Sequence, residues 1–184
     1  SKGIKYIYSH WIDFLGSPKT KPMPISDFED LCAGKGPQFA VHSVSFVPEL
    51  GPADNDQIPV PDLDSLLICP WDKTCAWVFS DLWWNVKPYD VCPRQTLKRQ
   101  IKKNADADLK FYVGMEPEFF VMKWEDGKPV KAIDRDPIPL RRQAFGYDSE
   151  YSIEGMDFLK EIIDILNEDL KWDLHDVVAE GAYG

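Results

Sequence analysis

The chain has 184 residues, 44% of them hydrophobic and 13% aromatic. It can therefore bury a sizeable core, either as one domain or as a small domain with part of a second. Its formal net charge of -10 and pI near 4.7 argue against nucleic acid or an anionic membrane as partner, because neither gains from an acidic surface.

The first 92 residues predict a small mixed sheet with one helix. Residues 4–14 are rich in aromatic and β-branched side chains and predict a strand, and residues 20–25 predict its antiparallel return. Residues 26–31, with a capping serine and early acids, predict a short helix. The remaining expectations are strands over residues 39–47, 66–69 and 76–82, and a proline-rich loop over residues 48–61.

A change of composition at residues 89–93 marks the expected domain boundary, with domains over residues 1–92 and 93–184. Pro93 suits the first position of a helix that runs to about residue 104, because its fixed φ is already helical. Leu97 and Ile101, four residues apart, are its expected buried stripe.

The second domain continues with strands and one long helix. Residues 111–122 predict a strand, followed by a hairpin turn at Asp126 and Gly127. Residues 154–170 repeat apolar side chains at three and four positions, which predicts an amphipathic scaffold helix. Residues 174–184 predict a last strand. The fold class expected for the whole chain is α+β.

Two carboxylates, Glu116 and Glu118, interrupt the apolar run over residues 111–122. In a strand both point to one face, where apolar residues bracket them and they would repel each other. A divalent cation with oxygen ligands would relieve both problems. The alternative is a half-buried strand whose glutamates face water.

Cysteine and histidine usage favours a reduced, cytoplasmic protein. The four cysteines and three histidines show no zinc-ligand spacing. No stretch approaches the roughly 18–20 apolar residues of a membrane span, and the N-terminus lacks a signal-peptide pattern.

An ordered series of motifs runs through nearly the whole chain. The motifs are Trp11-Ile12-Asp13-Phe14-Leu15-Gly16, Val60-Pro61-Asp62-Leu63-Asp64-Ser65-Leu66, Cys69-Pro70-Trp71, Cys92-Pro93-Arg94, Gly114-Met115-Glu116-Pro117-Glu118-Phe119-Phe120 and Glu180-Gly181-Ala182-Tyr183-Gly184. This series resembles the glutamine synthetase superfamily.

This resemblance implies an N-terminal β-grasp-like domain followed by the beginning of a catalytic domain. It also implies an ATP-dependent ligase that joins glutamate to ammonia through a γ-glutamyl phosphate, with Mg²⁺ or Mn²⁺ as cofactor. The implied assembly is a ring-based homo-oligomer, a dodecamer. In the family, further metal and ATP ligands follow the point where this sequence stops, so we expect residues 1–184 alone to be inactive.

The resemblance also implies roles for individual residues. Glu118 and Glu180 match ligands of the metal nearer glutamate, and Glu116 matches a ligand of the metal nearer ATP. Glu180 also matches a catalytic residue at the ammonium pocket, and Asp13 matches one that reaches into a neighbouring subunit's site to hold ammonium. Tyr147 matches a tyrosine near that pocket and is the candidate cofactor-binding residue.

Each of these residues has an ordinary structural alternative. Asp13 is equally well explained as a turn aspartate before Gly16. Glu180 would otherwise be a rim glutamate on an edge strand, and Tyr147 an aromatic that packs in a loop.

Two other functions stay open. One is a ligase that joins glutamate to methylamine or a polyamine. The other is a non-catalytic scaffold, against which the retention of Glu116, Glu118 and Glu180 speaks, because a structural protein has little reason to keep three converging acids.

Overall fold

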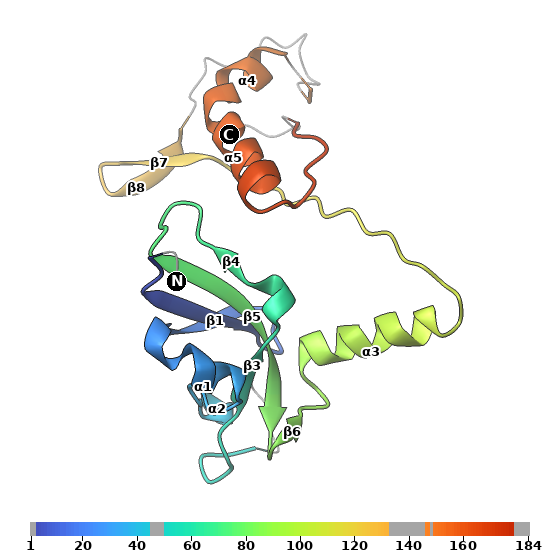
Figure 1. Cartoon of the computed structure of the whole chain (residues 1–184). Coiled ribbons are helices and arrows are strands. Elements are labelled where there is room, and N and C mark those ends of the chain that lie inside the picture. Colours follow the sequence, from blue (N-terminus) through green and yellow to red (C-terminus); the bar gives the residue numbers. More distant parts are fainter. Residues whose placement is uncertain (1–2, 45–49, 133–145, 148, 179–184) are drawn as a thin grey trace. The chain divides into compact units, whose positions relative to one another are not determined.

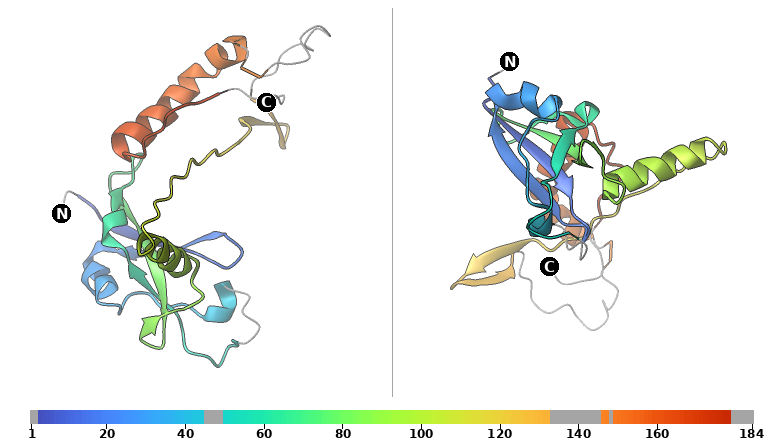
Figure 2. Two further views of the ribbon diagram at one scale, coloured as in Figure 1. Left: turned by 90° about the vertical axis from the view of Figure 1, so that its right-hand side faces the viewer. Right: turned by 90° about the horizontal axis from the view of Figure 1, so that it is seen from below.

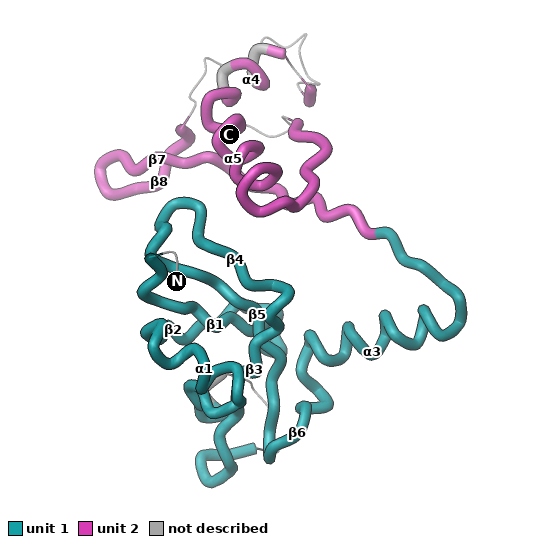
Figure 3. The backbone as a smooth tube through the Cα atoms, in the orientation of Figure 1, with its two compact units in different colours: residues 1–112 teal, residues 113–184 magenta. Residues whose placement is uncertain are grey.

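The computed structural model describes residues 3–44, 50–132, 146–147 and 149–178. The chain divides into two compact units, unit 1 over Ser1–Tyr112 and unit 2 over Val113–Gly184 (Figure 3). Unit 1 combines a mixed sheet with helices, and unit 2 combines a hairpin with helices. The expected mixture of helices and strands is confirmed, whereas the β-grasp description of the N-terminal part stays a prediction.

The sheet of unit 1 is built around β1 (Tyr6–Ile12) and β5 (Cys75–Trp84), which run parallel to each other (Figure 1). Its order is β2-β1-β5-β3, and β4 and β6 also pair with β5. The outer strands, all antiparallel to their neighbours, are β2 (Pro18–Pro24), β3 (Ile58–Pro61), β4 (Leu67–Ile68) and β6 (Lys87–Pro88). The strands predicted over residues 4–14, 20–25, 66–69 and 76–82 are therefore confirmed, with shifted ends.

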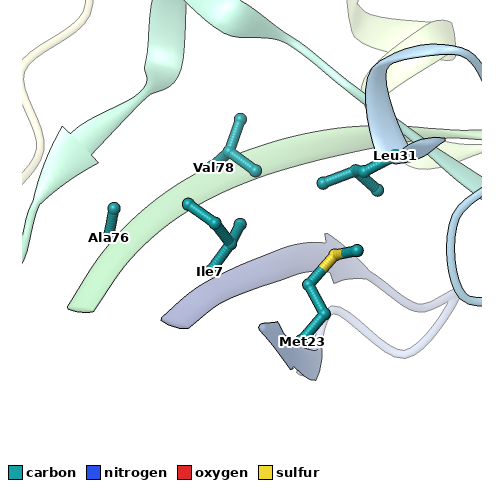
Figure 4. Packing of buried hydrophobic residues seen from close by; sticks show 5 residues of the cluster. All are labelled: Ile7, Met23, Leu31, Ala76 and Val78. Atoms are coloured by element: carbon teal, nitrogen blue, oxygen red, sulfur yellow. The ribbon is translucent and has the colours of Figure 1, made fainter. Parts of the chain in front are cut away.

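One face of this sheet carries the first hydrophobic core. The helix α1 (Phe28–Cys32), reached through the 3-10 turn η1 (Ile25–Asp27), confirms the predicted short helix and supplies the fully buried Leu31. Figure 4 shows the side chains that gather with it, which are Ile7, Met23, Ala76 and Val78. A Cβ on Gly36 would lie 2.9 Å from the Leu31 Cα, so this close approach requires glycine.

Two buried serines lie on the same face. Ser9 of β1 and Ser80 of β5 are both fully buried, and their hydroxyl oxygens are 2.8 Å apart. Each hydroxyl therefore satisfies the other, and the sheet buries two polar groups without leaving either unpaired.

A second core surrounds Trp11, whose ring stacks on Phe39 at 4.3 Å between centroids. The strand predicted over residues 39–47 is wrong in its described part. Phe39 makes only an isolated bridge with Gln57, and Val41–Val44 forms the short helix α2, while residues 45–49 lie outside the described residues. The ring stacking holds Phe39 against the sheet without a continuous ladder.

The loop predicted over residues 48–61 is confirmed over residues 50–57, apart from the isolated bridge of Gln57, and is wrong at its end, because Ile58–Pro61 forms β3. Pro59 and Pro61 would locally favour a loop. In the antiparallel pairing, however, Asp62 donates its N–H to the Phe79 carbonyl at 2.8 Å, so alternate residues 60 and 58 donate to β5. The two prolines fall on the positions whose N–H would point outward, where a missing donor costs nothing.

The helix α3 (Pro93–Ala105) begins with proline in its first turn, as predicted, and extends away from the sheet (Figure 2). Its predicted buried stripe is wrong, because Leu97 and Ile101 are 60% and 56% exposed. The helix is therefore attached to the rest of unit 1 by other means.

A polar cluster makes this attachment, and we call its residues Asp62, Asp81, Arg94 and Lys98 the α3 clamp. Arg94 contacts Asp62 at 2.8 Å and Asp81 at 3.1 Å. Lys98 contacts the same two carboxylates at 2.9 and 2.7 Å. The Arg94 guanidinium carbon also lies 5.7 Å from the ring centroid of Phe79, within the range of a cation–π contact.

Unit 2 contains the hairpin of β7 (Met122–Glu125) and β8 (Lys128–Lys131). Asp126 and Gly127 have φ values of 49° and 73°, which confirms the predicted turn. The helix predicted over residues 154–170 corresponds to α4 (Ser149–Glu154), α5 (Met156–Asp164) and the π-helical η3 (Ile165–Asp169).

Two predicted strands are not formed in the described residues. Residues 111–121 run as an extended trace outside any sheet, and only Met122 begins β7 (Figure 1). Residues 174–178 form no strand either, and residues 179–184 lie outside the described residues. A strand needs a hydrogen-bonded neighbour, and among the described residues neither segment has one along its length. No described helix has the length and apolar character to cross a membrane.

Candidate functional site

Asp13 is buried at the turn that joins β1 to β2, with only 4% of its surface exposed. Its Oδ1 accepts hydrogen bonds from the backbone N–H groups of Leu15 at 2.9 Å and Ser17 at 2.8 Å. Its Oδ2 lies 3.4 Å from the Lys19 Nζ. Gly16, with φ of +80°, supplies the left-handed residue that this turn needs. Asp13 therefore organises the hairpin, as its structural alternative predicted.

The same contacts set the charge of Asp13. Burial raises the pKa of its carboxyl, but the N–H groups of Ser17 and Leu15 and the ammonium of Lys19 outweigh burial, so the pKa lies below its ordinary value. Asp13 is therefore ionised at neutral pH and keeps the negative charge that a cation would require.

Glu116 and Glu118 lie in unit 2 on the extended segment before β7, and both are exposed. Among the residues that the structure describes, no group of three or more His, Cys, Asp and Glu side chains is placed to hold a metal ion. Two residues apart, these carboxylates would share one side of a regular strand. They supply two oxygen donors of the type that Mg²⁺ and Mn²⁺ take, and a further ligand has to come from elsewhere.

The end of this segment is held to unit 2 by two contacts. The ring of Phe119 lies edge-on to Phe158 of α5 at 6.3 Å between centroids. The Val121 carbonyl accepts a hydrogen bond of 3.0 Å from the Ala132 N–H, just beyond β8. The position of Glu118 is therefore tied to the hairpin and to α5 through its neighbours in sequence.

The two other predicted residues differ in what the structure shows. Glu180 lies outside the described residues. Tyr147 occupies a turn with φ of +64° and is 75% exposed. A positive φ is uncommon for an aromatic residue, and the exposed ring leaves Tyr147 accessible to a ligand.

The chain reverses direction after η3, before the segment that leads to Glu180. The Leu174 N–H donates to Asn167 Oδ1 at 2.6 Å, and Asn167 Nδ2 donates to the Leu174 carbonyl at 3.3 Å. Lys171 and Asp173 take positive φ values of 58° and 54° within this reversal. The two hydrogen bonds of Asn167 thus hold the start of residues 174–178 against the last turn of the helix.

His10, which the sequence gives no reason to choose, packs among aromatic rings, and its Nε2 is buried without a hydrogen-bond partner among the described residues. It stacks with Tyr8 at 6.2 Å and meets the edge of Trp77 at 5.3 Å between ring centroids. Burial lowers its pKa, so the ring is neutral at pH 7.

The ion pair between Lys19 and Asp13 is a feature that the sequence analysis does not predict. The Lys19 Nζ lies 3.4 Å from Oδ2 of the buried Asp13 carboxylate. The register that pairs Trp11 with Lys19 places Lys19 diagonally across the hairpin from Asp13 and on the same face. The sequence signal for this contact is a lysine two residues beyond the turn.

Comparison with known proteins identifies the family. Residues 90–184 match the family model described as glutamine synthetase, catalytic domain. A glutamine synthetase of Rhizobium meliloti is 30% identical over 183 residues, covering 100% of this chain and 40% of the relative. The chain therefore belongs to the glutamine synthetase family, which confirms the resemblance, and it spans 40% of the length of this relative.

Two further similarities concern a related activity and the fold. A glutamate–methylamine ligase of Methyloversatilis universalis is 27% identical over 186 residues, covering 98% of this chain and 40% of the relative. A solved structure of GmaS in complex with ADP superposes with a TM-score of 0.77 at 23% identity, covering 97% of this chain and 39% of that one. The fold of this chain is therefore similar to that of GmaS.

Proposed function

We propose that this chain is part of an ATP-dependent carbon–nitrogen ligase that joins glutamate to ammonia or a small amine through a γ-glutamyl phosphate. The observation that carries the proposal is the pair Glu116 and Glu118, exposed and two residues apart, inside the stretch that matches the catalytic-domain model. Such a reaction has to shield phosphate charge, and carboxylate-bound Mg²⁺ or Mn²⁺ supplies that shielding when bound.

The metal ligands in this proposal are Glu116, Glu118 and Glu180. Oxygen donors fit a hard divalent cation, and the two described carboxylates are exposed. Glu116 serves the metal nearer ATP, and Glu118 and Glu180 serve the metal nearer glutamate. Binding the cation also offsets the repulsion between the neighbouring carboxylates.

Asp13 and Glu180 hold the amine as a cation and assist its deprotonation before attack on the acyl phosphate. The low pKa of Asp13 supports this role, because a carboxylate ionised at neutral pH attracts an ammonium ion. Tyr147 contributes a ring near the same pocket, and its exposure is compatible with that contact.

The second candidate substrate is methylamine. It is favoured by the 27% identity to the glutamate–methylamine ligase of Methyloversatilis universalis, which covers 98% of this chain. Ammonia is favoured by the 30% identity to the Rhizobium meliloti protein. The two reactions differ only in the amine, so the same described residues serve both.

The rest of the proposal concerns assembly and organisation. The protein acts in the cytoplasm as a ring-based homo-oligomer, a dodecamer, in which Asp13 of one subunit approaches the site of the next. Residues 1–92 form the N-terminal β-grasp-like domain, and residues 93–184 begin the catalytic domain; the start of the family match at residue 90 supports this division.

The test measures phosphate release from ATP by the full-length gene product with glutamate plus either ammonia or methylamine. Glu118→Gln should lower turnover at least ~100-fold, since even outer-shell changes at metal sites cost 10–100-fold. Glu125→Gln is the matched control, because Glu125 is an exposed carboxylate of β7 whose ion pair is with Lys123.

A second readout is Mn²⁺ binding by electron paramagnetic resonance. Weaker binding in Glu118→Gln, with normal binding in Glu125→Gln, is the expected result. Ligase activity that survives in Glu118→Gln would refute the metal assignment, and no amine-dependent phosphate release in wild type would refute the function.

A further inference from the structure

Two buried cysteines face each other across the hairpin of β4 and β5, and both are free thiols. The strand pairing ends at Ile68 and Ala76. One residue further on, Cys69 lies opposite Cys75, and its N–H donates to the Cys75 carbonyl at 3.0 Å. Opposite residues of this hydrogen-bonded type share one face of the sheet, with Cα atoms about 5.5 Å apart. This separation lies within the roughly 4.4–6.8 Å that a disulfide spans.

The turn that joins the two cysteines is organised by Asp72. Its Oδ1 accepts hydrogen bonds from the Thr74 N–H at 2.9 Å and the Thr74 hydroxyl at 2.7 Å. Its carbonyl accepts a hydrogen bond of 3.0 Å from the Cys75 N–H, which is therefore directed into the turn rather than toward Cys69. The backbone is less constrained here than inside the sheet, so the small movement that joins two sulfur atoms leaves the rest of the sheet in place.

The second oxygen of Asp72 contacts the Cys75 thiol. The thiol donates to Asp72 Oδ2 at 3.1 Å. This hydrogen bond raises the pKa of the Cys75 thiol above its ordinary value, and burial and the negative charge of Asp72 act in the same direction. Cys75 is therefore protonated at neutral pH. Because the thiolate is the nucleophile, Cys75 reacts slowly while it keeps this contact.

We propose that Cys69 and Cys75 are a redox-sensitive modification site, at which a peroxide closes a reversible cross-strand disulfide and Asp72 limits the rate. The inference does not depend on the proposed ligase function. Both thiols are buried, but residues 71–73 of the turn are exposed. Only this turn separates the thiols from solvent, and hydrogen peroxide is little larger than water. Disulfides of reducing compartments are usually transient and redox-sensing, which is the behaviour expected of this pair.

The oxidation transfers two electrons from the two thiols to hydrogen peroxide. Cys69 reacts first, since the Cys75 thiol is held by Asp72. The Cys69 thiolate attacks one peroxide oxygen, the O–O bond breaks, and the products are Cys69 sulfenic acid and a hydroxide, which takes the thiol proton to form water. The Cys75 sulfur then attacks the sulfenic sulfur. The S–S bond forms, the S–O bond breaks, and the leaving hydroxide takes the Cys75 proton as a second water.

The test treats the full-length gene product with hydrogen peroxide, alkylates the remaining thiols and maps disulfides by mass spectrometry. The Cys32→Ser protein is used, because the exposed Cys32 could otherwise link two molecules. Cleavage before the aspartates at positions 64, 72, 81 and 90 places Cys69 in residues 64–71, Cys75 in residues 72–80 and Cys92 in a third peptide.

The expected product is the first two of these peptides joined to each other and released by dithiothreitol. Cys69→Ala should abolish the joined product, whereas Cys92→Ala, which also removes a buried thiol, should leave it unchanged. Cys69 joined to any cysteine other than Cys75, or both thiols left unlinked after peroxide, would overturn the proposal. Because this mapping is done with both cysteines in place, it does not depend on how well the alanine variants fold.

Asp72→Asn tests the control of the rate. The asparagine oxygen can still accept the hydrogen bonds of Thr74, but no negative charge remains beside the thiol, so disulfide formation at neutral pH should be about three- to tenfold faster. Cleavage after Lys73 then separates the two cysteines. Asp64→Asn is the matched control for net charge, since Asp64 is exposed on the 3-10 turn η2 (Leu63–Ser65). An unchanged or slower rate in Asp72→Asn, or equal acceleration in Asp64→Asn, would overturn the role of Asp72.

Discussion

Arg94→Met tests whether the α3 clamp holds α3 on the sheet. Methionine can still lie over Phe79 but cannot make the two ion pairs, each worth ~0.2–1 kcal/mol at this exposure, or the cation–π contact, worth ~0.5–1 kcal/mol. Lys98 still contacts Asp62 and Asp81, so neither carboxylate is left without a cation. We therefore expect the free energy of unfolding to fall by about 1–2 kcal/mol.

The assay is urea unfolding of the 184-residue chain followed by tryptophan fluorescence, together with amide hydrogen exchange. Lys102→Met is the matched control, since its partner Asp106 lies one turn away on the same exposed helix surface, and we expect a loss of only ~0.3–0.5 kcal/mol. In Arg94→Met the amides of α3 should exchange faster while those of β1 change less. Equal effects of the two variants, or equal acceleration in β1 and α3, would refute the role of the clamp.

The remaining predictions concern pH, packing and thiol exposure. The hydrogen bond from Lys98 lowers the Asp62 pKa, although burial acts in the opposite direction. The α3 clamp therefore contributes fully to the free energy of unfolding above pH 3.8, the ordinary pKa of Asp62, and this contribution is lost as the pH falls through the lowered pKa. In urea titrations at acid pH, the difference in free energy of unfolding between wild type and Lys98→Met should therefore shrink below about pH 4. A difference that grows in this range would contradict the prediction. Leu31→Ala should lower the free energy of unfolding in urea by about 2–5 kcal/mol, because Leu31 is fully buried. Leu15→Ala should lower it by less than about 0.5 kcal/mol, because Leu15 is 81% exposed, and equal losses would contradict the described burial. Cys32 is exposed, whereas Cys69, Cys75 and Cys92 are buried. After alkylation at neutral pH, mass spectrometry should therefore find Cys32 labelled first. Equally fast labelling of the three other cysteines would contradict their burial.

Elements with local signals could be predicted from sequence. Pro93 suits a helix N-terminus wherever it occurs, and Asp126 and Gly127 accept positive φ without help from the rest of the chain. The stripe of Leu97 and Ile101 was misleading for a physical reason. Periodicity shows which helix face would be buried against a partner, but it does not supply the partner, and in unit 1 the helix is held by charges instead.

The candidate site also combines features that a local sequence pattern could reveal with features that depend on the folded structure. Glu116 and Glu118 could be singled out because a spacing of two has a direct meaning on an extended chain. Their predicted strand could not be secured by local pattern, since it depends on neighbouring strands. The contact of Lys19 with Asp13 depends on the register of the hairpin, which becomes visible only when Trp11 and Lys19 are seen to pair.

The prolines of the outer strands have a consequence for how this sheet can meet other molecules. In β2, the register places residues 18, 20, 22 and 24 with their N–H positions away from β1, and all but Thr20 are proline. In β3 both outward positions, Pro59 and Pro61, are proline as well. Neither β2 nor β3 can therefore offer the row of donors that an incoming strand needs. Along β2 and β3, unit 1 is thereby protected against growth by strand addition.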